Sequence, residues 1–179
     1  FGYTQTEALS VFGVLTGMSL SVIFFPSVIT NSVSVILLPT IAEAEAAQNH
    51  TSIKKAIKRT ILSCLLLGFT SCIGFLLTGS FIGNVIFQNA LAGTFIKTLS
   101  WICPFLYLSS TLNSILHGLG HPKTTLFIGL IGCGIRIFFI YFIIPHLGIS
   151  AYLYGLITSQ IVMSVSSMIA LKNRITKNN

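Results

Sequence analysis

The sequence predicts an all-α integral membrane protein, and three properties of its composition support that class. Of the 179 residues, 53% are hydrophobic and only 7% are charged, and the mean hydropathy is +0.90. A soluble domain carries about 25% charged residues, so this chain has too few to cover a surface in water. The charges lie between or after long uncharged blocks, and about 20 apolar residues suffice for a helix to cross a bilayer.

Two other classes of fold are excluded by the pattern of the apolar residues. Strands of a membrane β-barrel alternate polar and apolar side chains, but the runs at Ile61–Gly68 and Ile135–Ile144 do not. Buried helices of a soluble protein need amphipathic helices around them, and the apolar blocks leave no room for these.

We predict a single membrane domain over residues 1–179 with about five transmembrane helices. The first apolar block contains no polar turn, so one long helix bent near Pro26 is favoured over two helices. A short turn at residues 145–148 separates the last two helices. The helices are expected at residues 8–42, 60–78, 95–116, 124–144 and 150–171, followed by a basic cytoplasmic tail at 172–179.

The positions of the basic residues predict how the chain lies in the plasma membrane. Eight cations fall in connections on one side of the predicted helices, and Lys97 alone falls on the other. Because cytoplasmic loops are rich in Lys and Arg, this side and the C-terminus are expected in the cytoplasm, with residue 1 outside. The eight residues are Lys54, Lys55, Lys58, Arg59, Lys123, Lys172, Arg174 and Lys177.

The net charge of +7 therefore describes membrane topology, and no nucleic-acid partner is predicted. The chain begins with Phe1 and shows no signal-peptide pattern, although its start is expected outside the cell. We therefore expect residues 1–179 to be the C-terminal part of a longer transporter.

Catalysis is not predicted, because the residues that most enzymes need are absent or scattered. Only Glu7, Glu43 and Glu45 are acidic, and there is no Asp. The four cysteines and four histidines form no motif with the spacing of metal ligands. The sequence thus indicates a protein that is not an enzyme and that has no metal or cofactor.

Arg136 is the one ionisable residue well inside a predicted span. It lies thirteen residues beyond Lys123 and so about 20 Å further along the helix. An arginine near the bilayer centre costs at least about 2.5 kcal/mol, which makes it a candidate contact for an anion such as a phosphate on the substrate pathway. The alternative is an arginine that reaches the outer headgroups or bonds a neighbouring helix.

Polar residues of the first helix form a second candidate site. Thr30, Asn31 and Ser34 share one face between Pro26 and Pro39, and the two prolines are candidate hinges. This face either lines a substrate pathway or bonds to neighbouring helices.

Buried amides and glycines carry the remaining expectations. The amide of Asn113 is a further candidate for the pathway or for bonds between helices. The Gly13–Gly17 pair and the glycines at 129, 132 and 134 predict close helix packing.

Several stretches together resemble one family of transporters. The first helix contributes Phe12-Gly13, Leu15-Thr16-Gly17-Met18, Pro26, Thr30-Asn31, Ser34, Leu38-Pro39 and Glu43-Ala44. Residues 104–108, 112–114, 118–120 and 136–149 continue the pattern in order. The chain resembles the stage V sporulation protein B group of the multidrug/oligosaccharidyl-lipid/polysaccharide exporter superfamily. It departs from that group at Arg136, where lysine is also common, and at Ala151, where glycine is common.

The resemblance implies a flippase that exports a lipid-linked oligosaccharide or cell-wall precursor by alternating access. Its substrate would be of the undecaprenyl pyrophosphate type, and the chain would form most of the C-terminal lobe beside a missing N-terminal lobe. A multidrug/cation antiporter of the same superfamily is the first alternative, although it favours a membrane-buried carboxylate for ion coupling. The second alternative is a truncated remnant without transport activity of its own.

Overall fold

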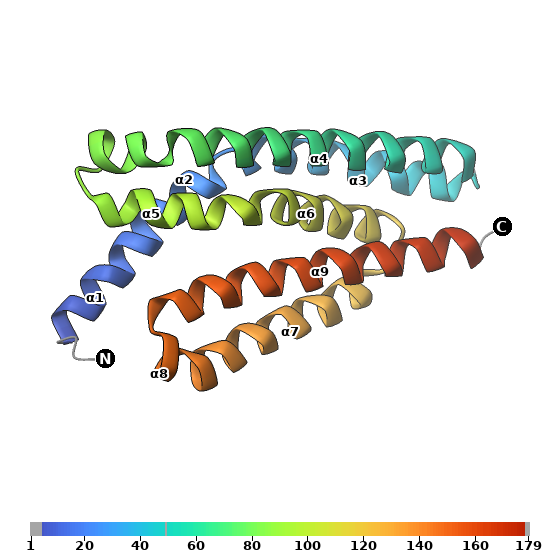
Figure 1. The fold of residues 1–179 in the computed structure, drawn as a ribbon. Helices are drawn as coiled ribbons and strands as arrows, with labels where there is room; N and C mark the ends of the chain where they lie inside the picture. Colours follow the sequence, from blue (N-terminus) through green and yellow to red (C-terminus); the bar gives the residue numbers. More distant parts are fainter. Residues whose placement is uncertain (1–4, 49, 178–179) are drawn as a thin grey trace.

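The computed structural model describes residues 5–48 and 50–177, and every regular element in these residues is helical (Figure 1). The helices form an elongated bundle. Its elements in chain order are α1 (Gln5–Gly13), η1 (Val14–Ser19), α2 (Leu20–Phe24), α3 (Ser27–Ala46), α4 (His50–Phe81), η2 (Ile82–Ile86), α5 (Ala90–Leu99), η3 (Ser100–Ile102), α6 (Cys103–Gly118), α7 (Pro122–Phe138), η4 (Phe139–Ile143), α8 (Ile144–Leu147) and α9 (Ile149–Lys177).

Six stretches within the described residues are long and apolar enough to cross a membrane, where about five were expected. They are Thr6–Phe24, Ser27–Ala46, Ile53–Ile86, Ala90–Gly118, Pro122–Leu147 and Ile149–Arg174. The extra stretch arises at Phe25–Pro26, which divides the first expected helix into two. The predicted all-α membrane class is confirmed.

The two halves of this divided segment run in one direction along the bundle (Figure 1). The Ser19 hydroxyl bonds the carbonyl of Ala92 at 3.2 Å, and Asn31, beyond the break, bonds Ser110 at 3.0 Å. Further on, Gly118 lies against the backbone of Leu38. Residues 19–38 therefore run parallel to residues 92–118. As a result, α1 begins at one end of the bundle and α9 terminates at the other.

Proline chemistry explains the break at Pro26. Proline has no backbone N–H, so the carbonyl one turn earlier loses its helical partner and neighbouring bonds are disturbed. Two side chains bond carbonyls before the break: the Ser27 hydroxyl donates to Phe24, and the Tyr107 hydroxyl donates to the Ile23 carbonyl at 2.9 Å. Pro39, in contrast, lies inside α3 without ending it.

Three helix ends differ from the sequence expectation. The helix expected from residue 60 begins at His50, because the basic segment before it is also helical. The expected tail from residue 172 continues α9 as far as Lys177. Pro145 lies in the short helix α8, and the turn into α9 is made at Gly148, whose φ of 62° favours glycine.

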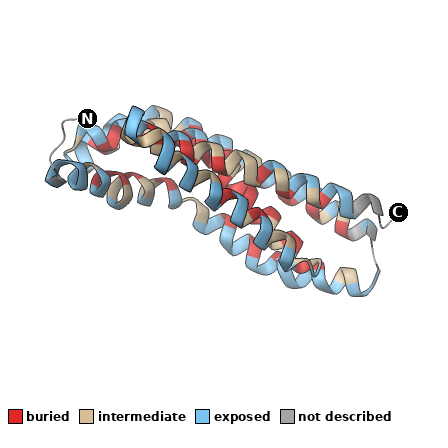
Figure 2. Cartoon of the chain, turned by 90° about the horizontal axis from the view of Figure 1, so that it is seen from below, coloured by how far each residue is buried: buried red, intermediate tan, exposed pale blue. Residues whose placement is uncertain are grey.

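Burial is concentrated in the stretch that α5, η3 and α6 form together. In the most apolar part of this stretch 67% of the residues are buried, whereas the corresponding share is 11% for the Pro122–Leu147 stretch. Figure 2 shows the buried positions gathered along the interior of the bundle, while the outer faces are exposed. α6 is therefore the central helix, and α7 lies at the periphery.

The predicted role of the glycine stripes in close packing is wrong for most of their members. Among the described residues, a Cβ atom added at Gly13 or Gly17 would meet nothing within 4 Å, and Gly129 and Gly134 are equally open. Only Gly132 of these lies tightly against a neighbour, the side chain of Met163. Other glycines, which the sequence did not single out, lie close to a neighbouring helix instead, for example Gly68 against Pro104 and Gly83 against Gly93.

Candidate functional site

Arg136 lies near the end of α7, where it is bonded to the neighbouring helix α9. Its Nε donates a hydrogen bond to the Ser159 hydroxyl at 3.0 Å, and this hydroxyl donates to the Leu156 carbonyl at 2.9 Å. Ser159 is fully buried. The bond therefore anchors the charged side chain between two apolar helices, as expected for an arginine that cannot be surrounded by water.

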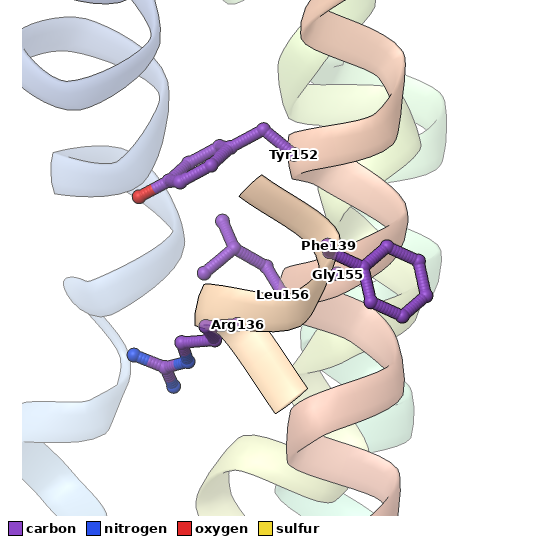
Figure 3. Close-up of a pocket in the computed structure, with 5 residues that line it drawn as sticks. All are labelled: Arg136, Phe139, Tyr152, Gly155 and Leu156. Atoms are coloured by element: carbon purple, nitrogen blue, oxygen red, sulfur yellow. The ribbon is translucent and has the colours of Figure 1, made fainter. Parts of the chain in front are cut away.

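The side chain also lines a crevice that is too narrow to hold a water molecule, together with Phe139, Tyr152, Gly155 and Leu156. The guanidinium and the Tyr152 ring both extend toward the N-terminal segment, whereas Phe139 points the other way (Figure 3). Phe12 of α1 reaches this side of the bundle and contacts the Tyr152 ring edge-on, with 5.9 Å between centroids. The guanidinium is thus directed toward the N-terminal segment, while its Nε is bonded to α9.

The candidate residues of α3 are divided between the interior and the surface. Thr30 and Ser34 are buried, and the Thr30 hydroxyl bonds the carbonyl of Ser27 at 2.9 Å. Asn31 is exposed and accepts a hydrogen bond from Ser110 of α6. Within the described residues the Ser34 hydroxyl has no hydrogen-bond partner. The polar face is therefore tied to α6 at Asn31 and enclosed beside it.

Asn113 belongs to a polar seam between α6 and α9. It accepts a hydrogen bond from Ser167 at 3.1 Å, and one turn earlier Ser109 donates to Gln160 at 3.1 Å. Ser109, Ser110 and Asn113 thus bond two different neighbours of α6. Such interhelical bonds satisfy polar groups inside a bilayer and fix how helices align.

The structure does not gather the predicted residues into one site. α3 packs on α6, α6 packs on α9, and α9 packs on α7, so Asn31 and Arg136 belong to opposite sides of the bundle. The partners of these residues, Ser110, Ser159 and Ser167, were missed by sequence reasoning. A lone serine in an apolar helix gives no signal until its neighbouring helix is known.

The basic connections meet at one end of the bundle, which we call the basic end. There α3 ends, α4 begins, α6 turns into α7, and α9 ends (Figure 1). The Arg174 side chain is hydrogen-bonded to His121, with 3.2 Å between Nη2 and Nδ1, and this bond connects α9 to the α6–α7 turn. Partial burial and then the Arg174 charge lower the pKa of His121, against the opposing effect of Glu45. Because a guanidinium only donates hydrogen bonds, Nδ1 of His121 is the acceptor in this contact.

Fold and intramembrane polar groups together define a multi-pass helical membrane protein with polar contacts between its spans. The family of the lipid II flippase MurJ matches residues 13–179. The chain belongs to this family, whose members are transporters and not enzymes. The resemblance seen in the sequence is confirmed.

Two curated relatives from Bacillus subtilis (strain 168) agree with this assignment. Stage V sporulation protein B is 24% identical over 166 residues, which cover 92% of this chain and 32% of the relative. Sporulation protein YkvU is 31% identical over 64 residues, covering 36% of this chain and 14% of the relative. The chain therefore spans about a third or less of the length of these relatives. No solved structure matches it.

Proposed function

We propose that this chain forms part of a flippase that moves a lipid-linked cell-wall precursor across the plasma membrane by alternating access. Its substrate is a saccharide on an undecaprenyl pyrophosphate, of the lipid II type. The family assignment supports the class of substrate. Because the chain spans about a third of stage V sporulation protein B, we further propose that a second lobe completes the transport pathway.

The position of Arg136 inside the bundle is the observation that links this proposal to particular residues. A pyrophosphate entering an apolar bundle needs a cation, and arginine binds phosphate oxygens with two parallel hydrogen bonds. The bond from Nε to buried Ser159 holds the side chain in place, and the guanidinium extends toward the N-terminal segment. We propose that it contacts the pyrophosphate, and that Pro26 and Pro39 allow the first segment to bend between the two access states.

Substitution of Arg136 in the intact protein tests this role. We expect Arg136→Gln to lower precursor translocation roughly tenfold or more, because a charge-assisted hydrogen bond contributes about 1.5–3 kcal/mol. Arg136→Lys keeps the charge and should retain part of the activity. The measurement is the rate at which labelled precursor appears on the outer face of reconstituted vesicles, at equal protein content.

Lys97→Gln provides the matched control, because it removes one cation from a different helix, α5, at the end of the bundle away from the basic end. It should leave translocation close to that of the parent protein. Undiminished translocation by Arg136→Gln would contradict the anion contact.

We also propose that the basic end faces the cytoplasm, and two exposed glutamines allow a matched test. Gln48 follows α3 at the basic end, and Gln88 lies between η2 and α5 at the other end of the bundle. The two residues share a positive φ, 53° and 50°, so they are matched in backbone conformation. In a background without the exposed Cys133, Gln88→Cys should react with a membrane-impermeant maleimide on intact cells. Gln48→Cys should react only after permeabilisation, and the reverse pattern would overturn the orientation.

A further inference from the structure

A groove of about 530 Å³ runs between α7 and α9 at the basic end, and neither Arg136 nor the polar residues of α3 line it. Polar groups of Lys123, Thr124 and Asn173 line its outer part. Deeper along the same helices the lining becomes mainly apolar, with Phe127 on α7 and Ile169 on α9, although Ser166 is the deepest lining residue of α9. The groove therefore changes from polar to apolar with depth, as a phospholipid changes from headgroup to acyl chain.

The apolar part of the groove is open to its surroundings. Phe127 is 65% exposed and Ile169 is 55% exposed, so each offers an apolar surface that a chain of CH₂ groups covers well. In a spanning helix bundle these side chains lie within a turn or two of the membrane surface. An acyl chain in this groove would extend along α7 and α9 toward the bilayer centre.

The polar part of the groove carries positive charge only. Lys123 is exposed in the first turn of α7, where the N-terminal end of the helix dipole adds to its charge. None of the residues that line the groove is acidic. Arg174, next in sequence to Asn173, adds a further cation at the same end. These groups suit a phosphate diester that carries a net negative charge.

We propose that this groove is a binding site for one anionic phospholipid of the leaflet at the basic end. Its phosphate contacts Lys123 and Asn173, and one acyl chain lies between Phe127 and Ile169. A zwitterionic lipid is disfavoured because its ammonium group would lie beside the cations with no carboxylate among the lining residues to hold it. Each Lys or Arg near a membrane surface contributes about 1 kcal/mol to the attraction of anionic lipid.

Fluorescence quenching by brominated lipids tests the site in the intact, reconstituted protein. Trp101 is the one tryptophan of this chain and is replaced by Phe, and Phe127→Trp then places a reporter in the groove. Tryptophans elsewhere in the intact protein contribute equally to this variant and to its Trp101→Phe parent. We expect brominated phosphatidylglycerol to quench the difference signal at a mole fraction about fivefold lower than brominated phosphatidylcholine does.

Adding Lys123→Gln should remove this preference, whereas Lys58→Gln, which removes a cation from α4 at the same end, should leave it unchanged. Equal quenching by both lipids would show ordinary lipid contact and overturn the proposal. Quenching by neither lipid would show that another part of the protein or a second copy covers the groove, with the same consequence. A preference that survives Lys123→Gln would show that a group other than Lys123 recognises the lipid charge, and it would also contradict the proposal. None of these outcomes depends on transport activity.

Discussion

Gly68→Ala is expected to destabilise the protein strongly, although it adds only one methyl group. The Cβ of alanine would lie 2.6 Å from the Cα of Pro104, at the point where α4 crosses the start of α6. Both groups belong to helical backbone, so relief requires the helices to separate. Overpacking of this kind typically costs about 1–3 kcal/mol, and we expect a clearly lower midpoint of thermal unfolding in detergent.

Gly74→Ala is the matched control for this substitution. Gly74 lies in the same helix, but a Cβ added there meets nothing within 4 Å. Alanine is a better helix former than glycine, so this variant should unfold at the same temperature as the parent or slightly higher. Equal loss of stability in both variants would mean that the approach of Pro104 does not set the requirement for glycine at residue 68.

Tyr107→Phe is expected to weaken the same core by a different route. The Tyr107 hydroxyl donates to the carbonyl of Ile23 just before the break at Pro26, and both residues are fully buried. Phenylalanine keeps the ring and removes the donor, which leaves this carbonyl without its side-chain partner in an apolar interior. Such a loss costs about 1–3 kcal/mol, so the unfolding midpoint should fall measurably.

Tyr154→Phe supplies the control, because it removes a hydroxyl from a tyrosine that is 54% exposed on α9. Its unfolding midpoint should stay within the error of the parent. In addition, combining Tyr107→Phe with Pro26→Ala should recover part of the loss, since without the proline ring the helix can continue and the Ser27 N–H can bond the Ile23 carbonyl. A Tyr107→Phe variant as stable as the parent would show that the hydrogen bond does not support the bent segment.

The class of the protein was predictable from sequence because it depends on quantities that need no contacts. Long uncharged blocks and the scarcity of acids predict membrane helices wherever those helices pack. The bend at Pro26 was also predictable, since proline removes a backbone donor whatever surrounds it. The exact ends were not, because helices such as α4 and α9 continue past the apolar region into the basic segments.

Contacts between helices were less predictable, and the glycines show why. A GxxxG pattern states only that small residues share a face, and Gly13 and Gly17 share one that packs on nothing in the described structure. Gly79 and Gly83 form the same pattern and do pack closely, against Gly93, whereas Gly68 lies at a close crossing without any such pattern. Arg136 could be singled out by its charge, but its partner Ser159 is one of many serines. Which serine becomes the partner of Arg136 depends on how α7 and α9 align.

The central place of α6 has a consequence for how the chain is made. Ser110 bonds Asn31 of α3, and Thr111 bonds Cys64 of α4, so these partners are already synthesised when α6 leaves the ribosome. Ser109 and Asn113, by contrast, bond Gln160 and Ser167 of α9, which follow only after α7 and α8. During synthesis from the N-terminus, one side of α6 is therefore completed at once. The polar groups on the other side remain without their α9 partners in the bilayer until the last helix is inserted. Insertion of α9 is therefore the step that completes the packing around α6.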